Sequence, residues 1–218
     1  MLLDICTRMP RTVEHMSEPS QSNLYPVFEQ MIPRADRERR FGQRGCVVWL
    51  YGLSGSGKST IANTLEHALF EDGYVTQLLD GDNIRTGLNR DLGFSEADRT
   101  ENIRRIAEVA KLFAQSGIIV FASFITPLVS MREQAIKIIG KDDFMETYVH
   151  CSYEQCAERD PKGLYAKVAA GEVASFTGKD AEFQLPEKPD LWLDTEHQTV
   201  EQSVKTLHDA VLKRICLS

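Results

Sequence analysis

The chain has 218 residues, of which 42% are hydrophobic and 26% are charged, the proportions of an ordinary globular protein. This length is enough for one well-buried domain and short for two. The formal net charge is −7. That value argues against nucleic acid as the main partner, because the chain has no overall basic field to attract a phosphate backbone.

The cysteines, at positions 6, 46, 151, 156 and 216, are odd in number and form no C-x-x-C pair. We therefore expect free thiols in a reducing compartment. No apolar stretch reaches the length of a membrane-spanning helix, and the N-terminus lacks the apolar segment typical of a signal peptide. The protein is thus predicted to be cytoplasmic and to have no membrane contact.

The N-terminal part of the chain differs in pattern from the rest. Residues 1–22 are mostly polar without clear periodicity, which predicts a flexible segment. Residues 23–44 form an N-terminal arm that ends in the charged run Arg34–Arg40. This run is either a solvated helix or an arm that packs on a partner subunit or covers the site. The main domain is predicted to span 45–218.

A glycine-rich segment follows an apolar run at 46–51 and precedes a helical pattern at 61–70. It matches G-x-x-x-x-G-K-[ST] at every defined position, in the strand–loop–helix context that this phosphate-binding loop requires. Its glycines let backbone N–H groups turn toward phosphate oxygens, and the helix adds its positive pole. Lys58 would reach the outer phosphates and the Ser59 hydroxyl would ligate Mg²⁺. The predicted ATP-binding residues are Gly52, Leu53, Ser54, Gly55, Ser56, Gly57, Lys58, Ser59 and Thr60.

Strand and helix patterns alternate through the main domain. Strands are predicted at 46–51, 74–79, 118–124, 144–150 and 191–194, and further helices at about 96–115, 129–139 and 199–215. This alternation predicts an α/β fold of the P-loop NTPase type, a doubly wound parallel sheet with helices on both faces. Ligands of such folds bind at the carboxyl ends of the strands.

Two carboxylates and a guanidinium lie just past the second strand, in Asp80, Asp82 and Arg85. A phosphoryl transferase needs a carboxylate that holds Mg²⁺ and another that orients or deprotonates the acceptor hydroxyl. We assign Asp80, with Ser59, to the metal, and Asp82 to the hydroxyl, although the sequence alone leaves open which aspartate is the base. Asp-Gly is also an ordinary turn signal.

Further candidates lie in the second half of the domain. Arg99 and Asn102 are three residues apart, so they share one face of a helix and would point together at a ligand, or they are a solvated first turn. The segment at about 160–180 carries Gly163, Gly171 and Gly178. It is either a mobile flap that closes over substrate or a surface excursion.

Several motifs in order resemble those of the adenylylsulfate kinase family, over about residues 45 to 195. They are the phosphate loop, Asp80–Arg85, Leu92–Ser95, Asp98–Arg99, Glu101–Arg105, Ser123–Ile125, Asp160–Tyr165 and Phe176–Gly178. The resemblance implies transfer of the ATP γ-phosphate to the 3′-hydroxyl of adenosine 5′-phosphosulfate (APS). The product would be 3′-phosphoadenosine 5′-phosphosulfate, the activated donor of sulfate assimilation.

The resemblance also implies particular site residues. Contacts to APS would come from Asp82, Arg85, Phe94, Arg99, Asn102, Ile125, Thr126, Lys162 and Phe176, and Arg159 would lie near the ATP base. Local chemistry agrees, because phenylalanines stack on an adenine and basic side chains meet phosphate and sulfate. A homodimer and a separate ATP sulfurylase partner are further expectations.

Two positions depart from the family pattern. Thr126-Pro127 stands where the family commonly has Ser-Pro, whose serine is a phosphorylated intermediate in some members. Thr126 keeps a hydroxyl, so it is either a catalytic phosphate acceptor or a polar residue that ends a strand, and direct in-line transfer needs no such nucleophile. Ala169 stands where the family's flap often has an arginine. The alternatives to an adenylylsulfate kinase are a P-loop kinase for another anionic hydroxyl acceptor and a non-catalytic nucleotide-binding regulator.

Overall fold

The computed structural model describes residues 25–173 and 176–217. The chain divides into two compact units, 1–31 and 32–218. In the first unit the described residues contain one short 3₁₀ helix, η1 (Phe28–Gln30). The predicted flexible segment 1–22 lies outside the described residues. Every other element belongs to the second unit.

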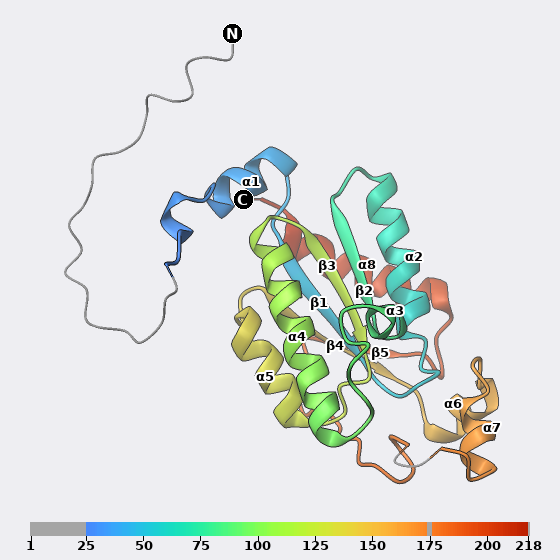
Figure 1. Cartoon of the computed structure of the whole chain (residues 1–218). Helices are drawn as coiled ribbons and strands as arrows, with labels where there is room; N and C mark the ends of the chain where they lie inside the picture. Colours follow the sequence, from blue (N-terminus) through green and yellow to red (C-terminus); the bar gives the residue numbers. More distant parts are fainter. Residues whose placement is uncertain (1–24, 174–175, 218) are drawn as a thin grey trace, which may run out of the picture. The chain divides into compact units, whose positions relative to one another are not determined.

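The described part of the second unit contains a parallel sheet of five strands (Figure 1). The strands are β1 (Cys46–Tyr51), β2 (Thr76–Asp80), β3 (Ile119–Phe124), β4 (Phe144–His150) and β5 (Leu191–Asp194). Their order is β2-β3-β1-β4-β5, and each neighbouring pair is parallel. From β1 the chain first forms the edge strand β2, then returns to β3 between them, and finally adds β4 and β5 on the other side of β1. This topology confirms the predicted doubly wound α/β fold.

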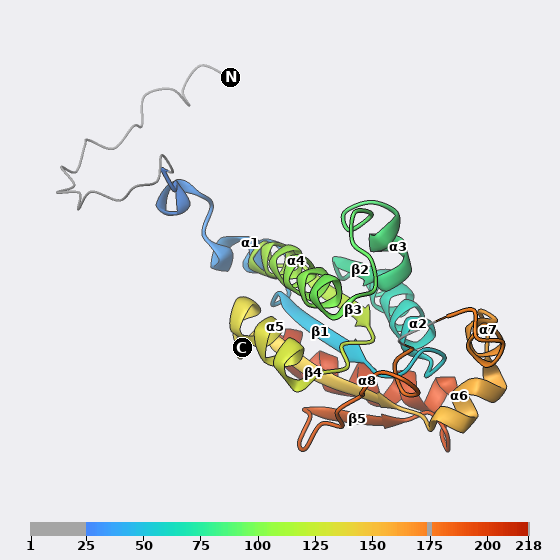
Figure 2. The same cartoon turned by 60° about the horizontal axis from the view of Figure 1, so that its bottom comes forward.

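Helices cover both faces of the sheet. On one face lie α4 (Glu96–Gln115) and α5 (Val129–Ile139), and on the other lie α2 (Lys58–Glu71) and α8 (Val200–Ile215) (Figures 1 and 2). The shorter helices are α1 (Arg34–Phe41), α3 (Gly81–Thr86), α6 (Tyr153–Arg159) and α7 (Leu164–Ala169). α6 and α7 lie beyond the carboxyl ends of the strands (Figure 1). No helix in the described part of the chain is both long enough and apolar enough to cross a bilayer.

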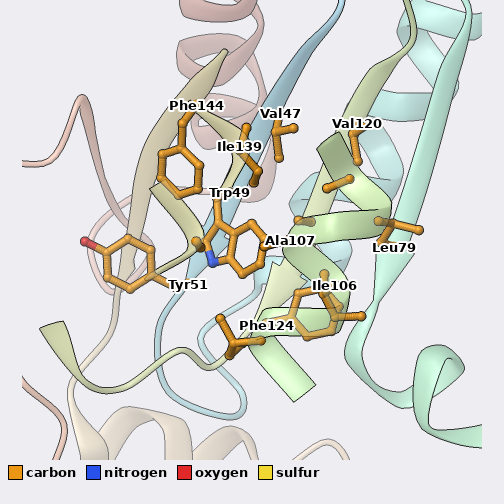
Figure 3. Close-up of a cluster of buried hydrophobic side chains, with 14 of the residues drawn as sticks. Val47, Trp49, Tyr51, Leu79, Ile106, Ala107, Val120, Phe124, Ile139 and Phe144 are labelled. Carbon is orange, nitrogen blue, oxygen red and sulfur yellow. The ribbon is translucent and has the colours of Figure 1, made fainter. Parts of the chain in front are cut away.

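Strand β1 shows why helices must cover both faces of the sheet. Its side chains alternate, as the pleat of a strand requires. Val47, Trp49 and Tyr51 join the core under α4 and α5, whereas the residues between them join the core under α2 and α8. Figure 3 shows the first core, in which the Trp49 ring lies between Phe124 and Phe144 with ring centroids 5.7 Å away in both cases.

Three short α-helices of the main domain were not predicted from the sequence. α3, α6 and α7 have only six or seven residues, too few for a periodic apolar pattern. Local caps start two of them. The Asp80 side chain accepts a hydrogen bond from the Asp82 amide at 3.1 Å, and the Ser152 hydroxyl accepts one from the Gln155 amide at 3.2 Å. Asp82 therefore lies on a helix rather than in a simple turn.

Candidate functional site

A cavity of about 1150 Å³ opens at the carboxyl ends of the central strands. Most of the predicted site residues line it: Ser54, Gly55, Gly57, Lys58, Ser59, Thr60, Asp80, Asp82, Arg85, Phe94, Arg99, Asn102, Ile125, Thr126, Arg159, Lys162 and Phe176. Gly52, Leu53 and Ser56 of the phosphate loop are not part of the lining. The sheet has thus brought together motifs that are far apart in the sequence, at the edge where the fold class predicts a ligand.

The phosphate loop has a backbone that its glycines make possible. Gly57 lies at a φ of 94° just before α2, a conformation that side chains rarely adopt. Gly52 passes so close to β4 that a Cβ would lie 2.3 Å from the Val149 carbonyl oxygen. Lys58 is buried, and its ammonium donates to the Leu53 carbonyl at 2.6 Å. Desolvation lowers the pKa of Lys58 to about 8. A bound anion would stabilise the charged form of this buried ammonium group.

Three oxygen-bearing side chains meet beside the loop. The Ser59 hydroxyl donates to the Asp80 carboxylate at 2.6 Å and lies 3.2 Å from the Ser123 hydroxyl. Ser123 reaches this place because it is the register partner of Asp80 on the neighbouring strand. Among the described residues there is no group of three or more His, Cys, Asp or Glu that would hold a metal alone. These three side chains offer only oxygen ligands, one of them a carboxylate. Such a set fits a Mg²⁺ ion that also binds the phosphates of a substrate.

Asp82 lies on α3, one short turn from that oxygen cluster. Its carboxylate forms an ion pair with the ammonium of Lys162, which belongs to the predicted flap. Both side chains are largely solvent-exposed, with 70% and 51% of their surfaces accessible. The ion pair therefore joins the predicted flap to α3, and both of its members line the cavity.

Cationic and aromatic groups form the adjoining wall. The guanidinium of Arg85 lies over the Phe94 ring, 4.4 Å from its centroid. Arg99 donates to the Phe94 carbonyl at 2.9 Å and to the Thr177 hydroxyl at 2.5 Å. Burial is the leading cause that lowers the pKa of both arginines. This wall offers positive charge for an anion and an exposed ring for a flat group.

Asn102 is buried where it lines the cavity. The amide nitrogen of Asn89, another buried residue, donates to the Asn102 amide oxygen at 2.9 Å. An amide whose oxygen is engaged this way presents its NH₂ group as the remaining donor. Asn89 is not among the residues predicted from the sequence, although its place before the Leu92–Ser95 motif was a signal.

Thr126 has an unusual conformation. Its φ is 42°, in a region that β-branched residues avoid. The side chain is buried, and its hydroxyl oxygen accepts a hydrogen bond from the Trp49 indole at 3.0 Å. Arg132 donates to its carbonyl at 3.2 Å. The roles of Trp49 and Arg132 are not predicted from the sequence, because apolar runs and helical patterns do not indicate polar contacts.

Arg159 lies at the other end of the cavity, at the end of α6. It donates to the Thr195 carbonyl at 2.5 Å, and the Thr195 hydroxyl donates to the Ser56 carbonyl at 2.8 Å. Thr195 thus connects the phosphate loop to Arg159. Thr195 is not among the residues predicted from the sequence, although its position directly after the last strand was a sufficient signal.

The flap approaches the phosphate loop through aromatic residues. Phe176 packs edge-on against Tyr165, with ring centroids 4.9 Å apart, and the Tyr165 hydroxyl donates to the Ser54 carbonyl at 2.7 Å. Glu172, which the sequence analysis did not single out, also lines the cavity. Ala169 is exposed at the end of α7, outside the lining. Residues 174–175 lie outside the described residues.

Comparisons with known proteins agree with this geometry. A family model described as adenylylsulphate kinase matches residues 44–194. The adenylyl-sulfate kinase of Bacteroides thetaiotaomicron is 53% identical over 195 residues, which are 89% of this chain and 97% of that protein. That of Clostridium acetobutylicum is 52% identical over 179 residues, 82% of this chain and 89% of that protein. The structure of Mycobacterium tuberculosis APS kinase CysC with AMPPNP and APS has a TM-score of 0.75 and 45% identity, covering 78% of this chain and 98% of that one.

The family model matches well over half of the chain, and two relatives of the same name share more than half of their aligned residues with it. Both relatives are covered almost to their full length. The chain therefore belongs to the adenylylsulphate kinase family.

Proposed function

We propose that this chain transfers the γ-phosphate of ATP to the 3′-hydroxyl of APS and so produces 3′-phosphoadenosine 5′-phosphosulfate. Relatives at 53% identity along nearly their whole length support this reaction, as does the likeness to an APS kinase that holds APS and AMPPNP. The observation that carries it is that one cavity joins a phosphate loop to an arginine-rich aromatic wall. The cavity can therefore hold ATP and a second, anionic nucleotide-like acceptor in the alignment that phosphate transfer needs.

The phosphate loop forms the ATP half of the cavity. Backbone N–H groups of the loop and of the first turn of α2 bind the phosphates, and the Lys58 ammonium leaves the Leu53 carbonyl to contact the outer ones. Arg159, which the Thr195 carbonyl orients at 2.5 Å, contacts the base. Phosphate binding favours the charged form of Lys58, which offsets the cost of its burial.

Ser59 and Asp80, which lie next to the Ser123 hydroxyl, are the residues that would hold Mg²⁺. When bound, the ion neutralises part of the charge on the transferring phosphoryl group. The Asp80 carboxylate also caps α3. It thereby keeps Asp82 at a fixed place relative to the transferring group.

The acceptor half is formed by α3, the start of α4 and the flap. Asp82 orients the 3′-hydroxyl and takes its proton. Arg85, Arg99 and Lys162 bind the phosphate and sulfate of APS. Phe94 and Phe176 stack on the adenine, and Asn102, Ile125 and Thr126 complete the pocket. Direct in-line transfer then needs no covalent enzyme intermediate.

The test is ATP-dependent conversion of APS, with the product identified by mass. The expected product is one phosphate heavier than APS and absent with Lys58→Ala. If APS is not converted while ATP still binds, a panel of other anionic hydroxyl compounds tests for a kinase with a different acceptor. Nucleotide binding without transfer to any acceptor would instead indicate a non-catalytic regulator.

We also propose a homodimer and a separate ATP sulfurylase that supplies APS, as the family resemblance suggests, and a cytoplasmic location, as the cysteines suggest. The described cysteines, Cys46, Cys151, Cys156 and Cys216, are free thiols, which suits a reducing compartment. Light scattering of the purified protein tests the dimer. A coupled assay with the sulfurylase, compared with added APS, tests whether the partner changes the rate.

A further inference from the structure

We propose that Arg132, a residue outside the cavity lining, positions the acceptor side of the site by holding the Thr126-Pro127 segment and the chain that returns from the flap. The proposal rests on the APS kinase function proposed above. It assigns Arg132 a positioning role, because the side chain acts through other residues and not on the substrate.

Arg132 lies on α5, and only 3% of its side chain is exposed. Burying a guanidinium is costly unless its charge and its donors find partners. The Glu146 carboxylate lies 3.6 Å from Arg132 Nε, and the Tyr51 ring lies under the guanidinium at 4.9 Å. The Tyr51 hydroxyl in turn donates to Glu146 at 2.7 Å. These contacts compensate the buried charge and fix the plane of the guanidinium.

The fixed guanidinium holds a strained segment. One of its terminal nitrogens, Nη1, donates to the carbonyl oxygens of Thr126 and Pro127, at 3.2 Å in both cases. Thr126 is the residue at a φ of 42°, and such a backbone persists only where its surroundings determine it. Both residues line the cavity, as does Ile125 before them. Arg132 therefore fixes the shape of one wall of the acceptor pocket.

The other terminal nitrogen, Nη2, reaches the end of the flap. It donates to the Gln184 carbonyl at 2.9 Å. The Gln184 amide donates back to the Pro127 carbonyl at 2.9 Å, and its side-chain oxygen accepts from the Val129 amide at 2.8 Å. Gln184 is the part of the chain to which the flap returns after Phe176. One guanidinium thus connects the two segments that bring Thr126 and Phe176 to the acceptor.

Only an arginine makes this set of contacts. Its planar fork offers several donors at fixed angles, whereas a lysine ammonium is a point charge that would lose at least one of the carbonyls. Arg132→Lys should therefore keep the buried charge and the fold but loosen the acceptor wall. The phosphate loop should be affected less, because Lys58 and Tyr165 also hold it.

Arg214 is the matched control. It also donates to a backbone carbonyl, that of Phe144 at 2.9 Å, and it pairs with Asp190 at 3.3 Å. Phe144 begins β4, so this contact lies at the amino end of the sheet, opposite to the cavity. Arg214→Lys perturbs an arginine with the same kind of contacts, without touching the acceptor wall.

The experiment measures kcat and the KM of APS and of ATP for Arg132→Lys, Arg214→Lys and the wild type, with thermal unfolding of each. We expect Arg132→Lys to raise the KM of APS by about tenfold or more, and the KM of ATP by less than about threefold. Arg214→Lys should change neither KM, even where it lowers the unfolding temperature. Tyr51→Phe, which removes only the hydroxyl that holds Glu146, is the milder second variant and should raise the KM of APS by about threefold.

Unchanged KM values in a destabilised Arg132→Lys would overturn the proposal, because they would show a structural role only. An equal rise in both KM values would also overturn it. If Arg132→Lys does not fold, Tyr51→Phe decides by the same comparison. Absence of product from the wild type would instead overturn the APS kinase function, and this proposal with it, so the two failures are distinct.

Discussion

The indole nitrogen of Trp49 donates a hydrogen bond to the Thr126 hydroxyl oxygen, with 3.0 Å between the two atoms. Trp49 lies in the middle of β1 and in the core between the sheet and α4 (Figure 3), whereas Thr126 follows the end of β3. A core residue thus reaches a polar group of the cavity wall. Because only 1% of Thr126 is exposed, we expect its hydroxyl to fix the shape of the wall and not to accept a phosphate.

Thr126→Ala should therefore keep turnover within about tenfold of the wild type, because no covalent step is lost. It should lower the free energy of unfolding by about 1–3 kcal/mol, since the buried indole N–H loses its acceptor. Thr126→Ser should keep both properties. The measurements are kcat, denaturant unfolding, and labelling of the protein by radioactive ATP without acceptor.

Thr147→Val is the control for this variant. Thr147 is fully buried on β4, and its hydroxyl has no hydrogen-bond partner in the described part of the structure. Removal of this hydroxyl should therefore lower the free energy of unfolding only slightly. A labelled wild-type protein, together with loss of about 10³ or more in kcat for Thr126→Ala, would contradict the positioning role and support the phosphorylated intermediate.

Phe94 gives a prediction about acceptor affinity. Its side chain is 67% exposed and rests on the Arg85 guanidinium at 4.4 Å. Stacking of a base on an aromatic ring contributes about 1–3 kcal/mol, so Phe94→Ala should raise the KM of APS by about tenfold or more. The unfolding temperature should change little, because little apolar surface is buried there.

The control for Phe94→Ala is Phe70→Ala. Phe70 is 70% exposed and lies on α2, outside the cavity lining. Steady-state kinetics and thermal unfolding of both variants separate loss of stacking from loss of an exposed phenylalanine in general. Identical KM values for the two variants would show that Phe94 does not contact the acceptor.

The central strands and the nucleotide half of the site could be predicted from the sequence. Strand β1 is an unbroken apolar run, which indicates a strand covered on both faces, and the residues from Gly52 to Ser59 have fixed spacing. Asp80 was predictable because it ends a strand beside that loop. These features depend on residues that are close in the sequence, so local patterns reveal them.

The contacts that shape the acceptor half could not be predicted in the same way. Arg132 stands in a helical segment next to other polar residues, and its burial depends on Glu146 and Tyr51, which come from two other strands. Nothing in a threonine before a proline indicates the positive φ of Thr126. Such features arise from tertiary packing, which no local pattern encodes.

Asp82 gives a prediction that separates chemistry from binding. Its carboxylate lines the cavity and pairs with Lys162, and an amide in its place cannot take a proton. Asp82→Asn should lower kcat by about 10²–10⁴ while the affinity for ATP stays within about threefold. Asp91→Asn is the control, because Asp91 is an acid that pairs with Arg105 instead. Losses of the same size in kcat and in ATP affinity would count against the role of base.

Lys58 gives a prediction about pH. Burial lowers its pKa from the ordinary 10.5 to about 8, so the folded protein releases this proton at lower pH than the unfolded chain does. Between these two values the unfolded state binds more protons, and the contribution of Lys58 to stability therefore rises with pH. Below about pH 8 the full cost of the buried charge is present. Lys58→Met removes both the buried charge and the free-energy cost of burying it.

We therefore expect Lys58→Met to lose kinase activity, and its stability relative to the wild type to be greatest at neutral pH and to shrink as the pH rises above about 8. Thermal unfolding of both proteins across this range measures the difference. Lys205→Met, at a lysine whose side chain is 77% exposed, controls for the loss of a charge that burial does not penalise. A difference in stability that stays constant with pH would show that the ammonium of Lys58 is not destabilised by its burial in the phosphate loop.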